Sequence, residues 1–211
     1  MAYRRADAYE QATACLTEAL AESRQSRDDR HVADTLYHLG TVAWSNGRNA
    51  QAIAFHSEAV DICERLRLRD LVAVQAFHGR GEAHFANSEP LSAIGCYTRS
   101  LELAHAIGDK SYECENLMMI GHACTGTMGL GDYARATTHF EAAVEIARSA
   151  DLQWHLGPTL LGLDHVRACT GRYGEAWTGM NKTLRWLEEL KQVRYQLIAY
   201  SFLGDCCWTL S

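Results

Sequence analysis

The chain repeats a pattern of 40 to 43 residues along almost its whole length. Residues 36–62 align with residues 77–103 without a gap, at a spacing of 41. Further copies occupy residues 117–146, with three extra residues, and residues 160–186. A half copy begins at Tyr200, and the opening residues match only the second half of the pattern. Repeats of this length bury their apolar faces against neighbouring copies, so the pattern predicts a stacked array.

Small residues occupy fixed columns of the repeat. The strictest column is alanine, and a glycine column lies upstream of it, where the fourth copy carries Asp164 instead. Small residues at fixed positions let two helices approach closely, because little side chain lies between their backbones. The members of the columns are Ala12, Ala52, Ala93, Ala136 and Ala176 for alanine, Gly40, Gly81, Gly121 and Gly204 for glycine, and Leu36, Phe77, Leu117, Leu160 and Tyr200 for a third column of large residues.

Each copy reads as two helices joined by a short turn. Apolar residues at helical spacing mark the first helix. The second helix is expected to begin near Asn49, Pro90, Asp132 or Tyr173. Proline suits a first helical turn because its missing N–H has no partner there, and Asp132 suits an N-cap. Pro158 predicts a delayed or bent first helix in the fourth copy.

No stretch alternates strictly between apolar and polar residues, so no sheet is expected. We therefore predict an all-α fold of about ten antiparallel helices in a single array over residues 1–211. Its predicted parts are the second helix of a leading unit at 3–27, full units at 31–69, 70–109, 111–150 and 153–191, and the first helix of a trailing unit at 193–211.

The alanine and glycine columns, the Gly-Arg or Gly-Asp turns and the small–aliphatic pairs after the alanines resemble tetratricopeptide repeats. The spacing exceeds the usual 34 residues of that family. It is similar to the longer repeats of G-protein-regulator scaffolds, kinesin light chains and bacterial STAND-type regulators or nucleotide cyclases. The resemblance implies a right-handed α–α superhelix whose first helices line a concave groove.

Carried onto this sequence, the resemblance implies one turn-spaced stripe of groove residues on the first helix of each unit. No stripe position is Lys or Arg, so the carboxylate clamp of chaperone-binding members is not expected. Aromatic, histidine and acidic side chains there would suit a peptide or partner helix with apolar anchors and some positive charge. Trp44 and Phe85 have an alternative reading as core wedges between units. The candidate partner-binding residues are Tyr37, Thr41, Trp44, His78, Glu82, Phe85, Met118, His122, Leu161, His165 and Asp205.

The chain offers little sign of chemistry. His78 with Glu82, and His122 and His165 in the next two units, could in principle hold zinc, but neighbouring helices stand roughly 10 Å apart. No H-E-x-x-H motif, C-x-x-C spacing, phosphate loop or catalytic triad is recognisable. We therefore predict a non-enzyme with no cofactor and no metal. Arg65, Arg67 and Arg69 are read as solvated charges at a helix end.

Charge and cysteine content bear on partners and compartment. The net charge of −6 argues against nucleic acid as a partner. No apolar run is long enough to span a membrane, and no secretion signal is recognisable. The eight scattered cysteines are read as free thiols, so a cytoplasmic location is expected.

The expected function is a non-catalytic interaction scaffold or sensor module, part of a larger bacterial signalling or transcription regulator. The last helix is apolar on most sides, which suggests a fragment of a longer array or a docking end. One alternative is therefore a self-assembly module that forms a homodimer through residues 197–210. Another is a metal- or small-molecule-binding accessory domain of an enzyme.

Overall fold

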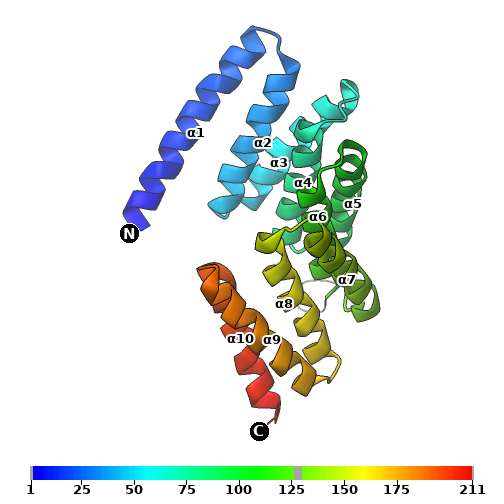
Figure 1. Cartoon of the computed structure of the whole chain (residues 1–211). Coiled ribbons are helices and arrows are strands. Elements are labelled where there is room, and N and C mark those ends of the chain that lie inside the picture. The colour runs from blue at the N-terminus through cyan, green and yellow to red at the C-terminus, as the bar shows by residue number, and fades with distance from the viewer. Residues whose placement is uncertain (1, 126–129, 211) are drawn as a thin grey trace. The chain divides into compact units, whose positions relative to one another are not determined.

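The computed structural model describes residues 2–125 and 130–210, and the side chains of residues 8–125 and 130–204. This described part consists of ten α-helices and contains no strand (Figure 1), which confirms the predicted all-α fold class. The chain divides into two compact units, Met1–Asp109 and Lys110–Ser211. The division falls between the second and third full repeats.

The first unit contains five helices, each packed on the next in chain order. In addition, α2 packs on α4, so the first helices of successive repeats are neighbours. The bounds are α1 Ala2–Gln25, α2 Asp29–Ser45, α3 Asn49–Arg65, α4 Leu71–Ala86 and α5 Pro90–Ile107.

The second unit repeats this arrangement. Its five helices again pack in chain order, and α8 contacts both α6 and α10. The bounds are α6 Lys110–Cys124, α7 Tyr133–Ser149, α8 Gln153–Cys169, α9 Tyr173–Glu189 and α10 Val193–Leu210.

Local sequence signals explain several helix starts. Pro90 is the first residue of α5, and the Asp132 side chain caps α7 by accepting from the backbone N–H of Arg135 at 3.0 Å. The prediction for Pro158 needs correction in one respect. The helix α8 begins at Gln153, so Pro158 does not delay its start but lies buried inside it.

The alanine column forms the core, as expected: Ala52, Ala93, Ala136 and Ala176 have no exposed surface. Glycines of the first helices also form packing surfaces for large side chains, which the columns alone did not reveal. The ring residue four positions after Ala52, Ala93 and Ala136 packs against glycines of the first helices: the His56 ring lies on Gly40 and Gly79, Tyr97 on Gly81, and Phe140 on Gly121 and Gly162. The missing glycine side chains therefore make room for rings.

Candidate functional site

The candidate groove of the first unit lies on two neighbouring helices. Tyr37 and Trp44 on α2, and Glu82 and Phe85 on α4, are all half-buried. Trp44 packs partly against a buried cluster of alanines. Trp44 and Phe85 are therefore partly packed between helices and partly exposed, so each side chain keeps some surface for a partner. Thr41, also half-buried, donates its hydroxyl to the Tyr37 carbonyl at 3.1 Å.

The candidate groove of the second unit is more closed. Met118 and Leu161 are buried, with 7% and 2% of their surface exposed, whereas His122 and His165 are half-buried. A partner would therefore contact the two histidines more than the two apolar residues. Asp205 lies outside the residues whose side chains the structure describes.

The groove histidines pack on rings of the second helices or of the following first helix. The His78 ring centroid lies 5.5 Å from that of Tyr97, and the His122 centroid lies 5.0 Å from that of Phe140 in an edge contact. His165 stacks on Phe202 at 4.4 Å. These aromatic contacts fix the orientation of each imidazole.

Burial governs the charge of His122. Burial lowers the pKa of His122 to about 4, and the positive charge of His165 adds to the effect. The His122 imidazole is therefore uncharged near pH 7 and presents an aromatic surface. The His78 Nε2 lies 4.0 Å from Glu82 Oε2. Within the described residues, no group of three or more His, Cys, Asp or Glu side chains is arranged to hold a metal ion.

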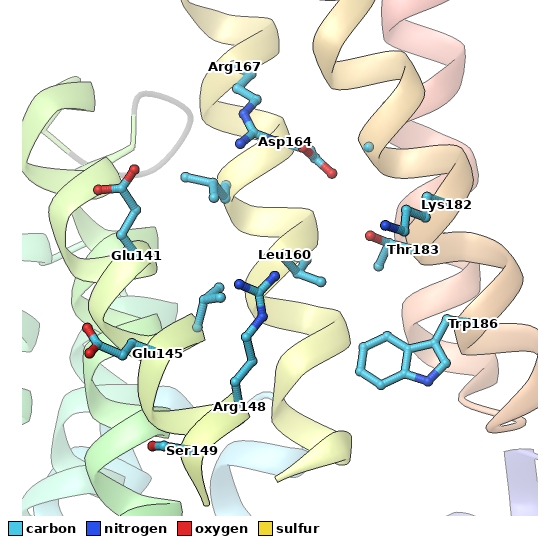
Figure 2. A pocket seen from close by; sticks show the side chains of 13 residues that line it. Glu141, Glu145, Arg148, Ser149, Leu160, Asp164, Arg167, Lys182, Thr183 and Trp186 are labelled. Carbon is cyan, nitrogen blue, oxygen red and sulfur yellow. Dashed lines mark hydrogen bonds and ion pairs between the residues drawn. The ribbon is translucent and has the colours of Figure 1, made fainter. Parts of the chain in front are cut away.

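A separate pocket of about 880 Å³ lies over α8 in the second unit, between α7 and α9 (Figure 2). Its residues were not among the groove candidates. It is lined by Glu141, Val144, Glu145, Arg148 and Ser149 from α7, Leu160, Leu163, Asp164 and Arg167 from α8, and Gly179, Lys182, Thr183 and Trp186 from α9. One sequence signal that pointed here was the break in the glycine column at Asp164.

Asp164 is the most deeply placed charge of this pocket, with 2% of its surface exposed. Its Oδ1 accepts a hydrogen bond from Arg167 Nη1 at 2.5 Å, within the same helix. Burial raises the pKa of this carboxyl to about 6, although Arg167 opposes the shift. The ion pair thus offsets part of the desolvation of a charge placed where the other repeats carry glycine.

The cysteines whose side chains are described carry no disulfide. Four are buried: Cys63, Cys96, Cys114 and Cys124. Burial raises the pKa of the Cys63 thiol to about 12 and that of Cys114 to about 11. These thiols therefore act as small apolar core residues. No described helix is both long and apolar enough to traverse a bilayer.

Comparison with solved structures places the fold among tetratricopeptide-repeat arrays. A Rap protein solved with the Competence and Sporulation Factor superposes with a TM-score of 0.76 at 18% identity, over 98% of this chain and 60% of that one. A STAND protein with a tetratricopeptide repeat sensor, from Pyrococcus horikoshii, gives 0.74 at 15% identity, over 89% and 28% of the two chains. The kinesin light chain repeats of Podosopora anserina give 0.73 at 13% identity, over 90% and 92%.

The sequence comparison agrees with the fold. The tetratricopeptide repeat family model matches residues 1–65, and no curated protein sequence matches the chain. The match over residues 1–65 and the shared fold are consistent with a tetratricopeptide-repeat protein, in agreement with the resemblance seen in the sequence columns. It spans less than two thirds of the Rap structure and under a third of the STAND protein.

Proposed function

We propose that this chain is a non-catalytic interaction module that binds a peptide or a partner helix on its groove faces. Its fold is typical of protein–protein interaction scaffolds, and the Rap relative was solved with a bound factor. The observation that carries the proposal is the set of half-buried Tyr37, Trp44, Glu82 and Phe85 on the neighbouring helices α2 and α4. Half-exposed aromatics beside a carboxylate are typical of sites that take an apolar anchor next to a cation.

The proposed setting is a larger bacterial signalling or transcription regulator in the cytoplasm. Three features support it: the share of the Rap and STAND structures that the chain spans, free cysteines, and the absence from the described residues of a helix able to cross a membrane.

Selection from a library of random twelve-residue peptides tests the groove. We expect bound peptides to carry two apolar residues at helical spacing and at least one Lys or Arg. Trp44→Ala should weaken a selected peptide by about tenfold or more, because a buried aromatic anchor contributes about 2 kcal/mol. Glu82→Gln should weaken it by several-fold and reduce the salt dependence of binding.

Asp61→Asn is the matched control, since Asp61 is exposed on α3 and outside both groove stripes. Fluorescence anisotropy of labelled peptides gives the dissociation constants. Peptides that bind equally well to the Trp44, Glu82 and Asp61 variants would place the binding site elsewhere.

A second candidate function is self-assembly through α10. Val193, Leu197 and Tyr200 share one face of this helix and are 61%, 66% and 54% exposed. Apolar surface of this kind favours burial against a second copy.

A further inference from the structure

Two departures from the repeat coincide at the pocket over α8. Asp164 replaces the column glycine, and Gly179 stands three residues after the column alanine, where the other units carry Phe55, Cys96 and His139. A β-carbon at Gly179 would lie 2.3 Å from Asp164 Oδ1. The small residue in α9 therefore accommodates the carboxylate and leaves the space above it open.

The walls of the pocket present cations from two helices. Figure 2 shows Arg148 of α7 rising in front of Leu160, with Lys182 and Trp186 extending from α9 toward the same space. In the described part of the chain, Arg148 and Lys182 make no ion pair, whereas Arg167 is neutralised by Asp164. Arg148 and Lys182 are thus the cations available to a ligand.

The pocket is also lined by three acidic residues. Asp164 already holds Arg167. Glu141 and Glu145 line the α7 edge, and Figure 2 shows their carboxylates lying over α7 rather than between the helices. Both glutamates are exposed, as are Arg148 and Lys182, so water screens the charges of both signs at the pocket edges.

The floor and one wall are apolar. Val144 and Leu163 are buried, and Leu160 and Trp186 are half-buried. The volume of about 880 Å³ lies within the range of small-molecule sites, which combine apolar walls with a few polar groups. Because it bears both cations and an indole ring, the pocket matches a ligand with an anionic end and an apolar body.

We propose that the pocket between α7 and α9 binds an organic carboxylate, with its anionic group between Arg148 and Lys182 and its apolar part on Leu160 and Trp186. This site is distinct from the proposed groove. Leu161 and His165 of the groove stripe lie roughly 100° around α8 from Leu160 and Asp164, since successive helical residues are about 100° apart.

The corresponding place in the first unit is also cationic. Arg99 aligns with Lys182 and Phe77 with Leu160, at the same spacing as Ala93 and Ala176. There a smaller pocket of about 200 Å³ is lined by Arg67, Arg69 and Arg99 over Phe77. Two units that differ in sequence thus both present cations above an apolar floor between successive second helices.

Isothermal titration of the 211-residue chain with indole-3-acetate and octanoate tests the proposal. We expect binding of both acids and none of the neutral indole-3-acetamide. Arg148→Gln and Lys182→Gln should each weaken the acids by about tenfold, the usual effect of losing one charge-assisted hydrogen bond. Arg185→Gln is the matched control, because Arg185 lies on α9 but does not line the pocket.

A second arm identifies the source of the carboxylate. An N-acetylated tripeptide of alanine, tryptophan and leucine carries a single carboxylate at its C-terminus. Tighter binding of this peptide than of the two acids would support a partner chain as the source, and weaker binding would support a free small molecule.

Three results would overturn the proposal. They are no binding of any of the three carboxylates below about 10 mM, equal binding of the amide, or unchanged affinity in both the Arg148 and the Lys182 variants. Circular dichroism of each variant checks that the helices are retained. Neither variant changes the groove residues, so failure here leaves the groove proposal standing.

Discussion

At the residue scale, two buried rings of the core each lie against glycines of two neighbouring helices. Phe140 lies against Gly121 and Gly162, as His56 lies against Gly40 and Gly79. The ring side chain comes from the second helix of a repeat, and the glycines come from the first helices of that repeat and of the next repeat. One ring and two glycines thus join three helices.

Substituting Gly162 with alanine tests this arrangement. The added β-carbon would lie 2.4 Å from Phe140 Cε1, so Gly162→Ala should lower the free energy of unfolding by about 1–3 kcal/mol. Gly95→Ala is the control: Gly95 is exposed inside α5, and nothing lies within 4 Å of its built β-carbon. That change should raise stability by about 0.5–1 kcal/mol. Urea unfolding of both variants measures the two changes in the free energy of unfolding. Equal changes in Gly162→Ala and Gly95→Ala would refute the packing role of Gly162.

His56 makes this core sensitive to acid. It is 1% exposed, and burial lowers its pKa to about 4, with the positive charges of His78 and Arg80 acting in the same direction. The unfolded chain therefore binds the proton first as pH falls. The free energy of unfolding is therefore highest above pH 6.5. As the pH falls from 6.5 to about 4, it decreases by about 3 kcal/mol in all.

His56→Phe should remove most of this loss, because Phe140 already occupies an equivalent two-glycine site. Unfolding free energies measured by urea at pH 7 and pH 4.5 should differ less in the variant than in the parent. Some pH dependence should remain, since burial also lowers the pKa of His122. An unchanged difference between the two pH values would contradict the assignment to His56.

At the element scale, the sequence was sufficient to predict helices and their starts, because capping and first-turn preferences are local. Pro90 and Asp132 act within one turn of their own helix. The ring–glycine contacts and the pocket were not predicted, because they join residues on different helices. The column offset of four residues from alanine to ring could have revealed the first. The replacement of glycine by Asp164, and Gly179 where other repeats carry a larger residue, gave the hints of the pocket.

The turn between α4 and α5 carries a local cost that the equivalent turns avoid. Ser88 has φ 61°, in the left-handed region, where the aligned turns use Gly47 and Gly171. Ser88→Gly should raise the free energy of unfolding by about 1 kcal/mol, because a β-carbon is disfavoured in that conformation. Gly47→Ala should lower it by a similar amount. Thermal unfolding followed by circular dichroism measures both; a loss of stability in Ser88→Gly would show that the serine has another role.

At the scale of the whole molecule, the core and the surface carry different information. The buried alanine column recurs in every full repeat and defines the fold. The half-exposed groove position after the glycine column varies from repeat to repeat: it is Thr41, Glu82, His122 and His165 in turn. Packing therefore constrains the first set strongly and the second set weakly, which is why the fold follows from the sequence more readily than the partner does.

Self-association is the last property to predict at this scale. Val193, Leu197 and Tyr200 leave a strip of apolar surface on α10, and the 211-residue chain should dimerise as its concentration rises because burying this strip is favourable. Leu197→Glu should shift the chain toward monomer, since a carboxylate resists burial. Thr98→Glu adds the same charge at an exposed position on α5 and should leave the equilibrium unchanged. Sedimentation equilibrium over a hundredfold range of concentration distinguishes these outcomes, and a parent chain that stays monomeric throughout that range would exclude α10 as a self-assembly surface.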